Sequence, residues 1–223
     1  MNLKILYEDN HLVAVYKPAG ILVQANVIGV ENLLDIIKKF IKERDNKPGN
    51  VFLGLVHRLD RPVAGIVVFA KTSKSASRLS EQFREREVGK IYTALVEGET
   101  EDRGQLIHFI KKDTEKIVAV VGNEGDEGYQ ECRLEYERIK TNKKYSLLKI
   151  NLLTGRFNQI RVQLAHIGHP IVGDTKYGGK NSDVFGLCAT EIKFKKATSD
   201  EEVELKVDYP KEWDNLLSNS QCN

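Results

Sequence analysis

The stretch HRLDRPVAGIVVFAKT, from His57 to Thr72, joins a polar segment to an apolar one and organises the chain around it. Its apolar part, Ile66 to Ala70, and the earlier segment Val51 to Val56 are both nearly continuous, which is typical of strands covered on both faces. The polar residues His57 to Arg61 lie between these two predicted strands. Burying several ionisable groups there is costly unless they are paired or solvated, so this polar segment is a candidate site.

The charges in this segment allow two interpretations. If the strand continues through it, Arg58 and Asp60 lie on one face, because strand side chains alternate. Pro62 and Gly65 predict a sharp turn after it. The charges could belong to a reactive site or to an ordinary ion pair at a strand end, and the segment alone leaves both open.

A second segment, GRFNQIRVQLAHIGHPIVGD from Gly155 to Asp174, is rich in groups that bind carboxylates and phosphates. Apolar residues recur at helical spacing from Gly155 to Ile167 and predict a helix there. Arg161 could be a fixed cation that holds Asp60 ionised. By its pattern alone, Arg161 could equally be a surface arginine on a helix that packs against the core.

The rest of the chain combines hairpins and helices without strict alternation, which predicts an α+β fold. Turn-prone residues separate most of the predicted strands. The predicted strands span 3–7, 11–16, 51–56, 66–70, 90–97, two segments within 104–121, 129–139, 144–152, 185–195 and 203–207, and the predicted helices span 31–44, 73–88, 155–167 and 210–217.

The composition is that of a folded protein. The 223 residues suit one catalytic domain or two closely packed halves, with 41% hydrophobic and 30% charged residues. No apolar stretch is long enough to cross a membrane and no leader segment is visible, so we expect a cytoplasmic location. Three scattered cysteines, Cys132, Cys188 and Cys222, form no zinc-binding spacing and are expected to be reduced thiols.

The net charge of +2 argues against a protein held on nucleic acid by bulk charge, so such binding would need a local basic surface. One candidate lies within residues 71–90, and the other contains Arg156, Arg161 and Lys176. The first could also be an ordinary solvated helix surface, with neighbouring glutamates as partners.

Five segments resemble, in the same order, those of RluA-like pseudouridine synthases. HRLDRPVAGIVVFAKT resembles the catalytic signature, Gly155 to Asp174 the second signature, and Asp174 to Gly178 the GDxxYG motif. Val15 to Val23 is similar to the lysine–proline motif, and Lys90 to Tyr92 to the element that carries the active-site tyrosine. Together the matches cover nearly the whole chain and are specific, whereas HRLD alone would not be.

The resemblance implies an enzyme that isomerises uridine in structured RNA, ribosomal or transfer, to pseudouridine after flipping the nucleotide out. It implies a mixed, largely antiparallel central sheet with flanking helices and an active-site cleft across the sheet. We expect one catalytic domain over residues 1–223, with no separate N-terminal RNA-binding module. No cofactor or metal is expected, in agreement with the lack of a phosphate-loop, dinucleotide-binding or metal-ligand motif.

The resemblance also assigns catalytic roles. Asp60 is the expected nucleophile, attacking either the sugar or the uracil ring. Tyr92 is expected to stack on the flipped uracil, a role that we favour over proton removal because an unperturbed phenol is a poor base at neutral pH. Arg161 is the expected counter-charge of Asp60.

Four further residues are expected to bind the substrate. Arg58 would replace the flipped nucleotide or bind its phosphate. His57 would mainly orient the loop, while Arg156 and Gln159 would contact the RNA. We assign a supporting role to Lys17, Pro18, Asp174 and Tyr177.

Some positions depart from the family's commonest pattern and leave the target RNA open. Ala64 stands where serine is frequent, and Asn158, Gln24 and Cys188 stand where histidine is common. One rival is a catalytically silent RNA-binding protein of the same fold. Another is a nuclease or phosphoesterase using Asp60 and His57, which would require clustered metal-binding carboxylates or a histidine pair. We expect a monomer that acts on RNA without a membrane or an obligatory protein partner.

Overall fold

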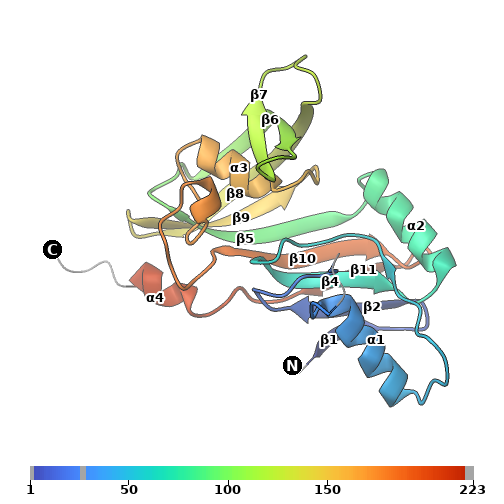
Figure 1. The fold of residues 1–223 in the computed structure, drawn as a ribbon. Helices are drawn as coiled ribbons and strands as arrows, with labels where there is room; N and C mark the ends of the chain where they lie inside the picture. Colours follow the sequence, from blue (N-terminus) through green and yellow to red (C-terminus); the bar gives the residue numbers. More distant parts are fainter. Residues whose placement is uncertain (1–2, 26–28, 219–223) are drawn as a thin grey trace. The chain divides into compact units, whose positions relative to one another are not determined.

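The computed structural model describes residues 3–25 and 29–218, so the prediction for Cys222 lies outside the described residues. The chain forms two compact units (Figure 1). Unit 1 comprises Met1–Gly89 and Glu191–Val207, and unit 2 comprises Lys90–Thr190 and Asp208–Asn223. A single catalytic domain over residues 1–223 stays a prediction.

The strands of unit 1 follow the predicted apolar segments. β1 (Lys4–Glu8) and β2 (Leu12–Lys17) form the predicted opening hairpin, and β2 pairs antiparallel with β4 (Ala64–Ala70). The hairpin turn is stabilised by the Asp9 carboxylate, which accepts from the N–H groups of His11 and Leu12 at 2.7 Å each. β10 (Leu187–Lys195), whose residues from Glu191 onward belong to unit 1, pairs with β11 (Glu202–Lys206).

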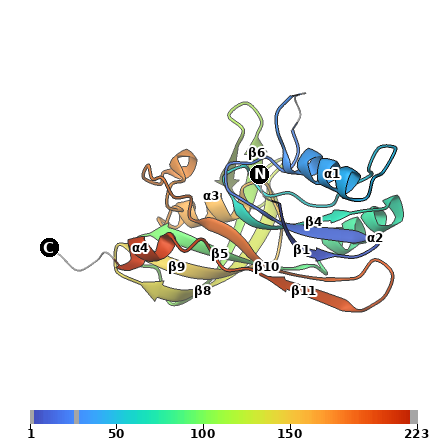
Figure 2. The same ribbon diagram turned by 90° about the horizontal axis from the view of Figure 1, so that it is seen from below.

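Two capped helices complete unit 1. In α1 (Leu33–Arg44), the Asn32 side chain accepts from the N–H of Asp35, and in α2 (Ser73–Arg84), Thr72 accepts from the N–H of Ser75. Such caps satisfy N–H groups that the helix itself leaves unbonded. α1 lies beside β1 and β4 (Figure 2). α2 ends four residues before the helix end predicted at residue 88, because the chain turns away at Arg86, whose φ is +63°.

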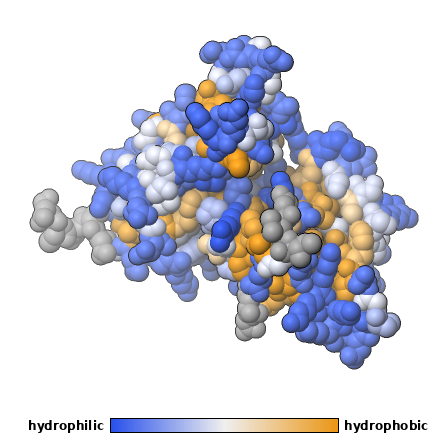
Figure 3. Space-filling model, viewed as in Figure 1, coloured by the Kyte–Doolittle hydropathy of each residue, from blue (hydrophilic) through white to orange (hydrophobic). Residues whose placement is uncertain are grey.

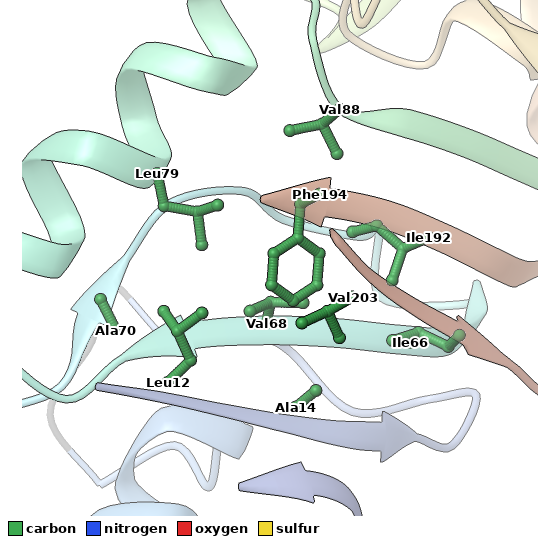
Figure 4. Close-up of a cluster of buried hydrophobic side chains, with 10 residues drawn as sticks. All are labelled: Leu12, Ala14, Ile66, Val68, Ala70, Leu79, Val88, Ile192, Phe194 and Val203. Carbon is green, nitrogen blue, oxygen red and sulfur yellow. The ribbon is translucent and has the colours of Figure 1, made fainter. Parts of the chain in front are cut away.

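The core of unit 1 lies between β4 and the elements that cover it. Figure 4 shows Leu79 from α2 and Phe194 from β10 directed toward the same apolar cluster as Ile66 and Val68 of β4. Every residue of β4 is buried, which confirms the prediction of a strand covered on both faces. Burial of each large side chain stabilises the fold by about 1.5–3 kcal/mol.

Unit 2 is built on an antiparallel meander in the order β5–β9–β8–β6–β7. These strands are β5 (Gly89–Glu97), β6 (Arg103–Asp113), β7 (Val118–Gly122), β8 (Gln130–Thr141) and β9 (Tyr145–Leu152). The helix α3 (Gln159–His166) contacts β6, β7 and the 3-10 helix η1 (Thr175–Tyr177). The last helix, α4 (Trp213–Ser218), contacts β9.

The predicted α+β fold with a largely antiparallel sheet is confirmed, and besides the earlier end of α2 two further boundaries are corrected. The predicted strand at 51–56 is reduced to the two residues of β3 (Gly54–Leu55), which pair with β4. The helix predicted from Gly155 begins at Gln159, because Asn158 adopts the left-handed conformation with φ 52°. Within the described residues, no helix is long and apolar enough to cross a membrane.

Candidate active site

Asp60 lies on a loop, not on a strand. β3 ends at Leu55, and the Asp60 carbonyl accepts from the N–H of Val63 at 3.1 Å, which closes a turn leading into β4. The strand therefore does not continue through the polar segment, and the condition under which Arg58 and Asp60 would share one strand face is not met. Arg58 is exposed and Asp60 is partly buried. The chain must reverse direction here, and Gly65 enters β4 with φ +124°, a conformation that favours glycine.

The buried ammonium group of Lys17 supports this loop. Its Nζ donates to the carbonyls of Pro18 at 3.1 Å, Ile21 at 2.8 Å and Arg61 at 3.0 Å. The Arg61 carbonyl also accepts from the N–H of Gly20, and Arg61 Nε donates back to the Gly20 carbonyl, both at 2.9 Å. Arg61, the residue after Asp60, is thus held by three hydrogen bonds, as expected for the supporting role of the lysine–proline motif.

His57, at the start of the loop, contacts β4 and α2. Its Nε2 accepts from the N–H of Val68 in β4 at 2.9 Å, so Nε2 carries no proton in this arrangement. Its ring stacks on Phe83 of α2 with centroids 4.8 Å apart. These contacts agree with the loop-orienting role expected for His57.

Arg161 is buried in unit 2 and is held by a carboxylate. Its Nε and Nη2 donate to the two oxygens of Asp174, both at 2.7 Å, in the bidentate geometry that makes such pairs strong. The guanidinium also lies over the rings of Tyr177 at 5.0 Å and Phe185 at 5.4 Å. The alternative of a surface arginine is therefore wrong. Pairing of Arg161 with Asp60, which belongs to the other unit, stays a prediction.

The GDxxYG segment connects Arg161 to the β6–β7 hairpin. The hydroxyl of Tyr177 accepts from the N–H of Ala119 in β7 at 2.7 Å, and Lys176 donates to the carbonyl of Ile117. Asp174, assigned to general architecture from the sequence, is thus the direct partner of Arg161. The GDxxYG motif indicates that Asp174 is important, but the spacing of the motif does not indicate which cation the carboxylate binds.

Gln159 supports the loop before α3 through its side-chain amide. Its Oε1 accepts from Thr154 Oγ1 at 2.8 Å and from the N–H of Arg156 at 3.0 Å. Its Nε2 donates to the Arg133 carbonyl at 3.1 Å and to Gln163 Oε1 at 3.0 Å. Since an amide side chain has two donor and two acceptor positions, all four are filled by protein groups in this structure. The contacts expected of Gln159 and of the exposed Arg156 with the substrate stay predictions.

Tyr92 lies near the start of β5, opposite Ile150 of β9, and is partly buried. Among the described residues, no group of three or more histidine, cysteine or acidic side chains is arranged to hold a metal ion. Cys132 and Cys188 are buried. Burial raises the pKa of the Cys132 thiol to about 11, so this side chain is a neutral thiol at physiological pH.

Comparisons with known proteins assign the chain to a family. The family model described as RNA pseudouridylate synthase matches residues 11–166. The tRNA pseudouridine synthase C of Vibrio vulnificus is 33% identical over 235 residues, covering 96% of this chain and 94% of the relative. The protein of the same name from Haemophilus influenzae is 35% identical over 187 residues, covering 79% of this chain and 76% of the relative.

Two solved structures are also similar. Human RNA Pseudouridylate Synthase Domain Containing 4 matches with a TM-score of 0.81 at 22% identity, covering 98% of this chain and 93% of that one. Human RNA Pseudouridylate Synthase Domain Containing 1 matches with a TM-score of 0.74 at 25% identity, covering 94% of this chain and 84% of that one. The first supports the fold alone. The matched family model and the bacterial relatives show that this chain belongs to the RNA pseudouridylate synthase family and is an RluA-like RNA pseudouridine synthase.

Proposed function

We propose that this enzyme converts a uridine of transfer RNA to pseudouridine, with Asp60 as the nucleophile. The observation that carries the proposal is the loop ending in Asp60, whose neighbour Arg61 is fixed by Lys17 and Gly20. A nucleophile on a fixed loop loses little freedom when it attacks. The relatives named tRNA pseudouridine synthase C, matched over most of their length, favour transfer RNA over ribosomal RNA.

The reaction needs no external oxidant or group donor. The N1–C1′ bond of the nucleotide breaks, the uracil turns, and a C5–C1′ bond forms. A proton leaves C5 and N1 gains one, so atoms and electrons balance within the nucleotide. Asp60 would bond transiently to the sugar or the ring and would be released when the C5–C1′ bond is complete.

Other residues would bind and orient the flipped nucleotide. We propose that Arg161 supplies the cation that holds the Asp60 carboxylate ionised, with Asp174 fixing the guanidinium. Tyr92 would stack on the uracil, and the exposed Arg58 would take the place of the extruded nucleotide. We propose that the enzyme acts as a monomer without a protein partner.

The test is conversion of uridine in defined RNAs by the purified protein, with a chelator and no added cofactor. We expect pseudouridine in transfer RNA, not in ribosomal RNA fragments, when the products are mapped by mass spectrometry. Pseudouridine in ribosomal RNA alone would overturn the substrate assignment. Binding without conversion would support the silent RNA-binding protein, and chelator-sensitive strand cleavage would support the nuclease.

A further inference from the structure

A basic cavity of about 330 Å³ lies in unit 2, between the β6–β7 hairpin and the loop before α3. Its size is near the lower end of about 300–1,000 Å³ for small-ligand sites. Its described lining includes three cations and no carboxylate, and consists of Ile110, Lys111, Lys112, Gly128, Gln130, Arg156 and Phe157. Figure 3 shows a hydrophilic hairpin tip with apolar surface below it.

The charge of Arg156 is not neutralised by the described part of unit 2. The other four arginines of the unit each form an ion pair with a carboxylate. They are Arg103 with Glu137, Arg133 with Glu131, Arg138 with Asp102 and Arg161 with Asp174. Arg156 is exposed and makes no ion pair with a described residue. An unneutralised guanidinium in a carboxylate-free cavity favours an anionic ligand.

The aromatic ring of Phe157 in the cavity lining lies close to Lys112 of the same lining and to Lys176 of η1. Lys112 Nζ lies 4.9 Å from the ring centre of Phe157, and Lys176 Nζ lies 5.8 Å from it. Phe157 is only partly buried. Cations beside an accessible aromatic ring are the combination with which proteins bind a nucleic-acid strand, since the cations bind phosphate and the ring packs on a base or ribose.

The cavity wall is held in place by contacts from η1. Lys176 donates to the carbonyl of Ile117, and the hydroxyl of Tyr177 accepts from the N–H of Ala119. Lys111 Nζ donates to the Glu127 carbonyl at 3.0 Å, which holds the following loop. The hairpin is therefore anchored before any ligand arrives, and binding in this cavity orders little of the chain.

We propose that this cavity binds a nucleotide of the RNA other than the isomerised uridine. Arg156 and Lys112 hold its phosphate, and Phe157 packs against its base or ribose. The proposal rests on the proposed function, because it takes the ligand to be the RNA substrate. Arg156 then binds the RNA at a nucleotide other than the reacting one, and the cavity contributes to the choice of the target RNA.

The first test is lysine footprinting of the wild-type protein, which avoids any variant that fails to fold. The protein is treated with an acetylating reagent with and without a transfer RNA transcript, and modification is mapped by mass spectrometry. We expect Lys112 to be protected severalfold by the RNA. The control is Lys140, an exposed lysine of β8 outside the cavity, which should be modified equally in both samples. Equal modification of Lys112 with and without RNA would overturn the proposal.

The second test measures affinity in an Asp60→Ala background, so that binding is separated from conversion. Lys112→Ala and Arg156→Ala should each weaken binding roughly three- to tenfold and lower the slope of log affinity against log salt by about one. Phe157→Leu should weaken binding without changing that slope, and Lys140→Ala should change neither.

The two proposals fail separately. Unchanged affinity and slope in Lys112→Ala and Arg156→Ala would refute the cavity while leaving the catalytic role of Asp60 intact. Conversion retained by Asp60→Ala would refute the nucleophile, and the affinities would still decide the role of the cavity.

Discussion

Removing the carboxylate of Asp174 is expected to destabilise unit 2 strongly, because it would leave the Arg161 guanidinium buried without that partner. The two side chains are 7% and 1% exposed and are joined by two contacts of 2.7 Å. At an effective dielectric constant of about 20, opposite charges roughly 4 Å apart attract by about 4 kcal/mol. Breaking a buried pair by removing one member costs about 3–5 kcal/mol, and we predict a loss in this range for Asp174→Ala.

The assay is urea unfolding followed by tryptophan fluorescence. The chain has a single tryptophan, Trp213, which is 1% exposed and belongs to unit 2. The matched control is Glu137→Ala, which breaks the ion pair with Arg103 at 3.0 Å, where the side chains are 79% and 57% exposed. That exposed pair should contribute less than about 1 kcal/mol.

A double-mutant cycle separates the interaction energy between Arg161 and Asp174 from the energies of their other contacts. The variant Arg161→Met with Asp174→Leu should be less destabilised than the sum of the two single changes, because no unpaired charge remains. A loss for Asp174→Ala no larger than that for Glu137→Ala, or strict additivity in the cycle, would refute this reasoning.

Three other perturbations probe unit 1. Hydrogen bonds from Arg44, and to a smaller extent from Lys71, lower the pKa of Glu8 from 4.5 to about 2. The contribution of Glu8 to the free energy of unfolding is therefore complete above pH 4.5 and is lost as the pH falls toward 2. The stability difference between wild type and Glu8→Gln, followed by circular dichroism, should fall from about 2 kcal/mol at pH 7 to near zero at pH ~2, and a pH-independent difference would contradict this. Lys17→Met removes a donor from three carbonyls and should speed hydrogen exchange in residues 55–63, whereas Lys42→Met, at an exposed position of α1, should not. Leu79→Ala should cost about 2–5 kcal/mol and Ile139→Ala, at a side chain 55% exposed, less than ~0.5 kcal/mol, so equal losses would exclude Leu79 from the core.

Local signals predicted most of the secondary structure. Continuous apolar residues marked β4, and the helical spacing of apolar residues marked α1. These patterns depend on a few neighbouring residues, and the elements that they predict are present in the folded protein. The α+β class follows from them, because it requires only the kind and order of the elements.

Two of the misplaced boundaries depend on contacts from distant parts of the sequence. The strand predicted at 51–56 is reduced to Gly54–Leu55, and the polar residues after it form a loop whose Arg61 is bound by Lys17 and Gly20, about forty positions earlier in the sequence. The residues before α3 stay irregular because the Gln159 amide binds the Arg133 carbonyl on β8 and the N–H of Arg156. No periodicity within either segment reports such contacts.

The same limit applies to the candidate site. The motifs indicated Asp60, Arg161 and Lys17 by resemblance, but not the pairing of Arg161 with Asp174 or the saturated amide of Gln159. Two of the four departures from the family pattern lie at positions that the structure constrains. Asn158 adopts φ 52°, which asparagine tolerates better than most residues, and Ala64 is buried at the start of β4.

The most direct test of the central claim is the single-turnover rate of pseudouridine formation in transfer RNA by Asp60→Asn, compared with wild type at RNA concentrations that saturate both proteins. The amide is almost the same size as the carboxylate but lacks the charge needed for attack. We predict no detectable pseudouridine from the variant, with RNA affinity close to that of wild type. Conversion by Asp60→Asn at a rate near that of wild type would contradict the account.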